Sequence, residues 1–314
     1  MEKQVEITKD IVIGTVDDKS LEADLFLPTK GEENGAAIVI VHGGGWREGD
    51  KGQLGGYGLL LAREGFVCLC SSYRLSQEEK WPAQIQDVKC AVRYLRKNSK
   101  KLNIEPERIG ITGNSAGGHL SLMAGLRKVS EEFEGNAGNN EVSSEVKAVC
   151  AIYPPAQIRN YENSDPEVDA YRALMGSEAK QQDYELASPL LQIKEDFPPT
   201  MLIHGSSDSV VKLSDTTDLY EKLTSLSIPT EIHIFSEEDH AFDAQSGYGR
   251  SVAELQNLFF KNIFKIGYRY FYLTKRSKSD SFVIRAFQRR YLPKNVTGKL
   301  DKKTLKISEL LLKN

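Results

Sequence analysis

The feature that most constrains the fold of this chain is a short glycine-flanked turn, GNSAG at residues 113–117. An apolar run, 108–112 (RIGIT), precedes the turn, and a helix-forming segment, 120–126, follows it. A serine in such a strand–turn–helix context has a strained backbone, and the glycines two residues before and after it leave room for the turn. Its hydroxyl then lies at the start of a helix, where backbone N–H groups favour developing negative charge. The pattern predicts that Ser115 is a nucleophile at the edge of a sheet.

Apolar runs alternate with helix-forming segments along most of the chain. This alternation predicts an α/β fold with a mostly parallel, eight-stranded sheet and helices on both faces. The expected strands are 5–13, 21–27, 36–41, 66–71, 108–112, 146–153, 200–203 and 230–235, and the expected helices are 53–64, 82–98, 120–126, 213–226 and 248–264. Two polar segments interrupt the pattern. Residues 131–144 are expected to form a solvent loop, and residues 156–188 a small cap over the site.

Three consecutive glycines follow the apolar run 36–41, in the stretch HGGGW at 42–46. Because glycines cost backbone entropy, a loop that keeps three of them needs a close approach or unusual dihedral angles. The stretch predicts an oxyanion hole, in which the N–H groups of Gly44 and Gly45 bind a carbonyl oxygen and the N–H of Ala116 is a further donor. The residues expected to contact the substrate are Trp46 and Asn114.

Residues for nucleophilic catalysis follow three of the expected strands, in the order Ser115, Asp208, His240. The carboxyl ends of parallel strands meet at one edge of a sheet, so these side chains are expected to converge there. A serine hydroxyl needs an imidazole to accept its proton, and the imidazole needs a carboxylate to fix its tautomer. Asp208 is favoured over Asp239 and Asp243 because it follows a core strand through a short turn.

The remaining histidines are predicted to be structural: His42 beside the glycine loop, His119 facing inward one helical turn after the serine, and His204 and His233 on strands. Asp87 and Arg93 lie on the expected helix 82–98 and are interpreted as ion-pair residues. No pattern indicates a metal site or a cofactor.

Four motifs in this order resemble the α/β-hydrolase superfamily: HGGGW at 42–46, GNSAGGHL at 113–120, SSD at 206–208 and DHAF at 239–242. They are similar to the esterase/lipase group with the hormone-sensitive-lipase-like enzymes, and closer still to small acetylesterases and feruloyl-esterase-like enzymes. The resemblance spans about residues 20–264. It implies an α/β-hydrolase fold with nucleophile, acid and base at Ser115, Asp208 and His240, and oxyanion donors at Gly44, Gly45 and Ala116.

Two departures keep alternatives open. Asn114 stands where the hormone-sensitive-lipase pattern usually has Asp, and the HGG-x-W form also occurs in kynurenine formamidases. The leading interpretation is a serine carboxylic-ester hydrolase, a short-chain carboxylesterase or acetylesterase, that acts on acetyl to butyryl esters, with acetylated sugars among the candidates. The alternatives are an arylformamidase-like amide hydrolase and a non-catalytic wall-binding protein on a hydrolase scaffold.

Charge divides the chain near residue 264. The segment 265–314 has 14 Lys and Arg residues against 3 Asp and Glu, whereas the whole chain has a net charge of −3. This shift predicts a hydrolase domain at 1–264 and a basic, all-helical module at 265–314. The module resembles the small peptidoglycan-binding module at the C-terminus of some cell-wall amidases, which implies contact with peptidoglycan. A basic helical hairpin docked on the acidic main domain is the alternative.

Other compositional features bear on the compartment. No apolar run reaches the ~20 residues of a membrane span, and the first residues lack the regions of a secretory signal. The four cysteines lie in apolar runs or on a helical face without C-x-x-C spacing, which indicates buried free thiols. A cytoplasmic location is expected for the chain as given, with the cell envelope as the alternative if a signal was removed. Nucleic acid is not an expected partner, because no recognition motif accompanies the basic tail.

Overall fold

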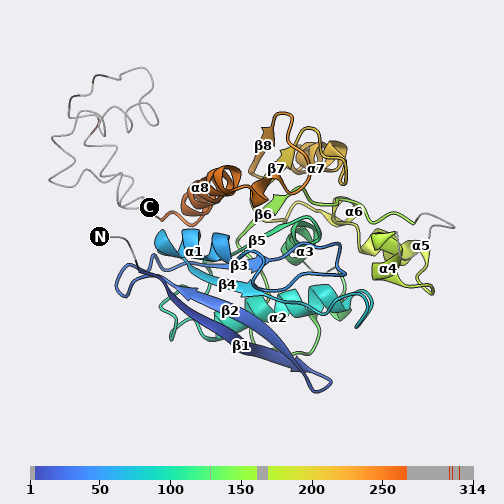
Figure 1. The fold of residues 1–314 in the computed structure, drawn as a ribbon, viewed down its shortest axis with the longest axis horizontal. Coiled ribbons are helices and arrows are strands. Elements are labelled where there is room, and N and C mark those ends of the chain that lie inside the picture. The colour runs from blue at the N-terminus through green and yellow to red at the C-terminus, as the bar shows by residue number, and fades with distance from the viewer. Residues whose placement is uncertain are drawn as a thin grey trace. The chain divides into compact units, whose positions relative to one another are not determined.

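The computed structural model describes residues 4–127, 129–160 and 169–266, together with Thr297, Lys299 and Thr304 (Figure 1). The chain separates into two compact units, Met1–Phe260 and Lys261–Asn314. The sheet and the residues predicted for catalysis belong to the first unit. The predicted basic module at 265–314 lies almost entirely outside the described residues, so its fold and its contact with peptidoglycan stay predictions.

One eight-stranded sheet forms the centre of the first unit, with the strand order β1-β2-β4-β3-β5-β6-β7-β8. The strands are β1 (Glu6–Val16), β2 (Lys19–Leu27), β3 (Ala37–Val41), β4 (Val67–Ser71), β5 (Ile109–Asn114), β6 (Ala148–Ile152), β7 (Thr200–Gly205) and β8 (Thr230–Phe235). The β1–β2 and β2–β4 pairs are antiparallel, and all the other pairs are parallel. The predicted α/β-hydrolase architecture, with a mostly parallel eight-stranded sheet, is confirmed.

Helices cover both faces of this sheet (Figure 1). Leu69 of β4 belongs to a buried apolar cluster with Ile85 of α2 (Ala83–Lys97), whereas a Cβ on Gly58 of α1 (Gly55–Arg63) would lie 3.1 Å from Cys70 Sγ. Successive residues of a strand point to opposite faces, so α1 and α2 lie on opposite sides. On the α2 side, α3 (Ala116–Gly125) and α7 (Leu213–Ser225) contribute Leu120 and Leu219 to the same cluster. On the other side lies α8 (Ser246–Ile263), whose Phe260 contacts Phe66.

The central strands are mostly apolar because both of their faces are covered. All five residues of β3 are buried, as are all those of β4 and β6. Such continuous apolar runs are typical of parallel strands between two helical layers. The four cysteines are buried free thiols, as predicted.

The segment 131–144 differs from its prediction. Glu131–Glu134 forms a 3₁₀ helix, η1, in which Phe133 is only 4% exposed. Ala137 is also buried, and its carbonyl accepts a hydrogen bond of 2.8 Å from the Thr15 N–H. The expectation of a solvent loop was wrong, because Phe133 and Ala137 are buried although most residues around them are acidic or polar.

The predicted cap segment 156–188 contains two short helices, α4 (Ala170–Met175) and α5 (Gln181–Leu186), and a third, α6 (Pro189–Gln192), follows it directly; residues 161–168 lie outside the described part. One end packs against the glycine loop: a Cβ on Gly45 would lie 3.6 Å from Ala170 Cβ, and the Tyr171 and Trp46 rings are 5.8 Å apart. Among the described helices, none combines the length and the apolar character that crossing a membrane requires.

Candidate active site

The turn between β5 and α3 places Ser115 at the first position before the helix. Its backbone has φ 52° and ψ −120°, a conformation that L-residues rarely adopt. The flanking glycines are required by close packing. A Cβ on Gly117 would lie 2.1 Å from the Val41 carbonyl oxygen, and one on Gly113 would lie 2.4 Å from the Gly117 oxygen. The sequence motif thus follows from the contact of α3 with the end of β3.

Three side chains from separate loops meet at this edge of the sheet. The loop after β7 carries Asp208, and the loop after β8 carries His240. The Nε2 atom of His240 lies 3.0 Å from Ser115 Oγ, and its Nδ1 atom lies 2.7 Å from Asp208 Oδ2. Because a carboxylate only accepts, Nδ1 carries the proton and Nε2 is left to accept the proton of the serine. The two competing acids bond elsewhere: Asp239 accepts from Ser209, and Asp243 from Tyr57 and Tyr153.

The carboxylate of Asp208 is buried and saturated with donors. Its side chain is 0% exposed. Oδ1 accepts from the N–H groups of Val210 and Val211 at 2.9 and 2.8 Å. Burial acts to raise the pKa of Asp208, but hydrogen bonds from His204, from His240 and from these N–H groups outweigh it, so the pKa lies well below its usual range. Asp208 therefore stays ionised beside the imidazole.

One of these donors was not anticipated. His204 was predicted to be structural, and its Nε2 atom lies 3.2 Å from Asp208 Oδ2. The same ring contacts Thr216 Oγ1 and the Val211 carbonyl. The available sequence signal was the four-residue spacing of His204 and Asp208 across the end of one strand.

The glycine loop lies directly against the serine turn. A Cβ on Gly43 would lie 3.3 Å from Ser115 Cβ. Gly44 and Gly45 have φ values of 97° and 57°, which glycine adopts without cost. No described residue accepts a hydrogen bond from the backbone N–H of Gly44, Gly45 or Ala116. These donors are therefore available to an incoming oxygen atom.

His42 braces this loop. Its Nδ1 donates to the Gly43 carbonyl at 2.8 Å, and its ring stacks on Tyr73 with centroids 4.3 Å apart. The Tyr73 hydroxyl is 3.2 Å from the carbonyl oxygens of both His42 and Gly43. Burial lowers the pKa of His42 to about 4, an effect that the bond to Gly43 opposes only partly. The imidazole is therefore neutral near pH 7, and it stabilises the glycine loop through its hydrogen bond to Gly43 and its stacking on Tyr73.

The two residues predicted to contact substrate differ in their surroundings. Trp46 is 1% exposed and packs against His119, with ring centroids 5.2 Å apart, so it presents little surface to a ligand here. Asn114 is 7% exposed; its Nδ2 donates to the Tyr153 hydroxyl at 3.0 Å, and its Oδ1 has no hydrogen-bond partner among the described residues.

Tyr153 was not singled out from the sequence, yet its ring centroid lies 4.6 Å from that of His240. Its φ of 37° is unusual for a bulky residue. Its hydroxyl donates to Asp243, and burial, reinforced by that carboxylate, raises the pKa of Tyr153 far above its ordinary value. The proton therefore stays on the tyrosine. The signal missed was the Tyr-Pro-Pro sequence directly after a buried strand.

The other polar residues predicted to be structural lie in the core or in ion pairs. His119 donates from Nε2 to the Ala187 carbonyl at 2.8 Å, and burial lowers its pKa to about 4. Asp87 pairs with Arg74 at 2.9 Å. Arg93 lies 3.4 Å from Glu134. Within the described part of the chain, no three metal-binding side chains are grouped as a metal site would need.

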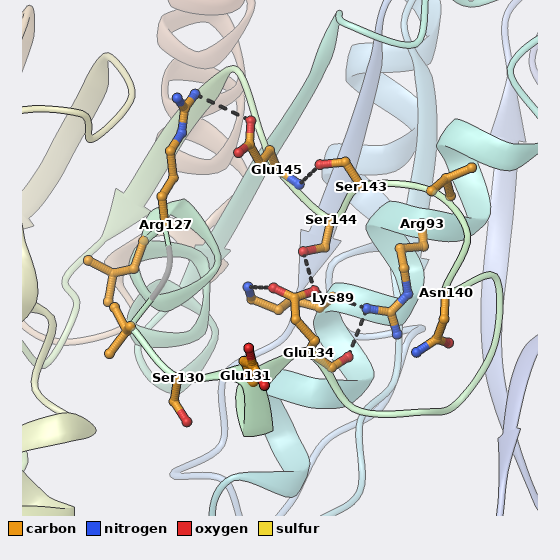
Figure 2. Close-up of a pocket in the computed structure, with 13 residues that line it drawn as sticks. Lys89, Arg93, Arg127, Ser130, Glu131, Glu134, Asn140, Ser143, Ser144 and Glu145 are labelled. Carbon is orange, nitrogen blue, oxygen red and sulfur yellow. Dashed lines mark hydrogen bonds and ion pairs between the residues drawn. The ribbon is translucent and has the colours of Figure 1, made fainter.

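Two cavities flank the ends of this architecture. One, of about 470 Å³, lies between α1 and the start of α8, and its lining includes Asn114 and Ala241, the chain neighbours of Ser115 and His240. The other, of about 590 Å³, lies at the opposite end of α3 (Figure 2) and is lined by polar residues that include Lys89, Arg93 and Glu134. The first cavity is lined by chain neighbours of Ser115 and His240, whereas Ser115, Asp208 and His240 themselves do not line it.

Comparison with known proteins assigns the chain to a family. A family model described as BD-FAE matches residues 23–223. The chain belongs to the BD-FAE family. The chain is 32% identical over 210 residues to the esterase LipC of Mycobacterium tuberculosis. The aligned region covers 64% of this chain and 50% of LipC. The chain is also 24% identical over 244 residues to the isoprenylcysteine alpha-carbonyl methylesterase ICME of Arabidopsis thaliana. That aligned region covers 75% of this chain and 56% of ICME.

Solved structures show the same architecture. A truncated carbohydrate esterase from gut microbiota superimposes with a TM-score of 0.71 and 28% identity, covering 82% of this chain and 96% of that chain. An acetyl ester-xyloside bifunctional hydrolase from Caldicellulosiruptor lactoaceticus gives a TM-score of 0.70 and 26% identity, covering 82% and 97%. The chain spans about half the length of the curated relatives it matches.

Proposed function

We propose that this BD-FAE family member is a serine carboxylic-ester hydrolase that works through an acyl-enzyme intermediate. The observation that carries the proposal is the continuous chain of contacts from Ser115 Oγ through His240 to Asp208, with distances of 3.0 and 2.7 Å. Each role in nucleophilic acyl transfer is filled by a side chain of the required type. A protein that only binds an ester has no need of a serine, an imidazole and a carboxylate in hydrogen-bonded series.

The reaction proceeds in two halves. Ser115 Oγ attacks the ester carbonyl carbon while His240 Nε2 takes the hydroxyl proton, and the tetrahedral intermediate collapses with that proton delivered to the departing alcohol. Water then attacks the acyl-enzyme, again giving its proton to His240, and the acid leaves as Ser115 regains the proton. The ionised Asp208 stabilises the imidazolium formed in each half, since its carboxylate is 2.7 Å from Nδ1.

The negative charge of the tetrahedral intermediate needs donors. We assign these to the N–H groups of Gly44, Gly45 and Ala116. The support is that these groups have no acceptor among the described residues and that the glycine loop lies against Ser115. Fixed N–H donors of this kind each contribute about 10²–10³ in turnover. The helix dipole of α3 acts in the same direction.

The substrate class is proposed to be a short-chain ester, with acetylated carbohydrates as the leading candidates. Two structural relatives at 26–28% identity are a carbohydrate esterase and an acetyl ester-xyloside hydrolase. The confined space at Ser115, where the Gly43 backbone approaches the serine closely, favours small acyl groups. We therefore expect turnover to fall from acetyl to butyryl and more steeply beyond.

The test is hydrolysis of a p-nitrophenyl ester series from acetyl to octanoyl, with acetylated xylan and N-formylkynurenine alongside. We expect acetyl esters to be hydrolysed and Ser115→Ala to lose at least about 10⁴-fold in kcat. Retention of hydrolysis in Ser115→Ala would overturn the mechanism. Preference for N-formylkynurenine over every ester would replace the assignment with an amide hydrolase, and no turnover of any of these substrates would favour a binding protein.

A further inference from the structure

A buried histidine and a buried threonine lie behind the acid of the proposed active site. His204 is the fifth residue of β7, and Thr216 lies in α7; both are 0% exposed. His204 Nε2 lies 3.0 Å from the Val211 carbonyl oxygen and 3.2 Å from Asp208 Oδ2, while Nδ1 lies 2.7 Å from Thr216 Oγ1. Neither residue contacts Ser115 in the described part of the chain. His204 reaches the proposed catalytic residues through Asp208 and through the ring of Tyr153, whose centroid lies 6.5 Å from that of His204 and 4.6 Å from that of His240.

The neighbours of the His204 ring define its tautomer. A carbonyl oxygen and a carboxylate only accept hydrogen bonds, and both lie against Nε2, so Nε2 carries the proton. Nδ1 then has a lone pair. Its partner is the Thr216 hydroxyl, which must therefore donate. The threonine thus selects the tautomer that directs an N–H group at the acid.

The two histidines share one oxygen atom of the acid. Asp208 Oδ2 accepts from His240 Nδ1 at 2.7 Å and lies 3.2 Å from His204 Nε2, which also lies 3.0 Å from the Val211 carbonyl oxygen, while Oδ1 accepts two backbone N–H groups. A buried carboxylate costs free energy unless donors surround it. With His204 removed, Oδ2 keeps only His240, and the carboxylate is freer to turn away from the position that orients the base.

We propose that Thr216 and His204 form a positioning pair that fixes the Asp208 carboxylate for its bond to His240. This inference rests on the proposed ester hydrolysis for its kinetic consequences, but its structural content does not. In the proposed series, Thr216 donates to His204, His204 to Asp208, and His240 to the same Asp208 oxygen. His204 and Thr216 are positioning residues, since neither contacts the reacting atoms.

The kinetic test uses turnover per active site, titrated with a fluorophosphonate so that misfolded protein is not counted. His204→Leu removes the donor, and we expect kcat to fall about 10–100-fold with KM little changed, because a misplaced catalytic group lowers the rate of chemistry. His204→Gln keeps a side-chain N–H and is expected to recover most of that loss. In the Asp208→Asn background, His204→Leu should add little, since both changes act on one unit.

Thr216→Val keeps the shape of the side chain and removes only the hydroxyl, so we expect a loss of about tenfold in kcat, and Thr216→Ser should restore it. The matched control is Thr217→Val, the same change at the next residue, where the hydroxyl is exposed and bonds to Ser214. A purely structural role for the pair would lower the midpoint of thermal unfolding in these variants while leaving kcat per titrated site unchanged, and that result would overturn the proposal.

An independent readout does not require catalysis. Ring-nitrogen NMR of ¹⁵N-histidine-labelled protein should show His204 protonated at Nε2 and unprotonated at Nδ1, and Thr216→Val should shift this toward a mixture of tautomers. The opposite tautomer in the wild-type protein would overturn the proposal even if the protein were a fully active esterase. Conversely, wild-type protein that lacks esterase activity but shows the expected tautomer and its response to Thr216→Val would overturn the proposed function and support the positioning pair.

Discussion

Two clusters of charged side chains lie at opposite ends of α3, and they are arranged differently. At the start of the helix, the contacts of Asp208 lead to an imidazole nitrogen and a serine hydroxyl. At its far end, the Glu134 cluster (Lys89, Arg93, Glu134 and Ser144) closes on itself (Figure 2). Glu134 lies 2.5 Å from Lys89 Nζ and 2.7 Å from Ser144 Oγ.

We interpret this difference as the one between the proposed active site and a cluster that stabilises the fold. Both clusters lower the pKa of a carboxyl group against the opposing effect of burial. Only the Asp208 cluster leads through an imidazole to a serine hydroxyl that lies against the glycine loop. The Glu134 cluster instead fastens the segment after η1 to α2, since Arg93 also donates to the Glu134 and Gly138 carbonyls. A perturbed carboxyl group alone therefore does not identify the active site.

Among substitutions of the charged residues in the two clusters, Asp208→Asn has the largest expected effect. The shape of the side chain is kept, but the amide disturbs the tautomer of His240, so kcat should fall about 10⁴-fold, or about 5.5 kcal/mol. Turnover of p-nitrophenyl acetate by folded protein is the measurement. A fall in kcat of less than tenfold would contradict the claim that the Asp208 cluster, unlike the Glu134 cluster, takes part in catalysis.

The next effect concerns the helix that joins them. Unfolding lets His119 return to a pKa near 6.5, whereas the folded pKa is about 4, so the unfolded state binds more protons within that window. The free energy of unfolding should therefore decrease as the pH falls from 6.5 to 4, with His119 contributing up to about 3 kcal/mol. His119→Gln, which keeps an N–H for Ala187, should flatten the profile measured by urea unfolding. His233→Gln is the control, and an unchanged slope in His119→Gln would contradict the burial argument.

The smallest effect is that of Glu134→Gln. Glu134 is about half exposed, so its pairs with the buried Lys89 and Arg93 are screened by solvent, and we expect a loss of about 1–2 kcal/mol in unfolding free energy. Activity per titrated site should not change. Because the folded pKa of Glu134 is lowered, its contribution is present near neutral pH and disappears as the carboxyl group protonates in acid. Glu141→Gln, at an exposed pair with Lys97, is the control and should have no measurable effect on stability.

Local sequence patterns were sufficient for the fold and for the choice of Ser115, Asp208 and His240 as candidates. The buried strands are continuous apolar runs in the sequence. Glycine is required at 113 and 117 because a Cβ at either position would collide with backbone oxygen atoms. The order of the strands along the chain then places their carboxyl ends together. The structure brings these three candidates within hydrogen-bond distance.

Partners that depend on the path of a loop were not predictable. Asp87 and Arg93 were both expected in ion pairs on one helix, but residues six apart point in different directions, so each pairs with another element. The contact of His204 with Asp208 depends on how residues 206–211 fold back. The contact of Tyr153 with His240 depends on a positive φ that the residue type disfavours.

The most direct test of the central claim is covalent labelling of the native protein with a fluorophosphonate, followed by mass mapping of the adduct. The account predicts one adduct per chain, located on Ser115, with hydrolysis of p-nitrophenyl acetate lost in proportion to labelling and with labelling slowed in Asp208→Asn. An adduct on another residue, or full hydrolytic activity after Ser115 is completely labelled, would contradict it.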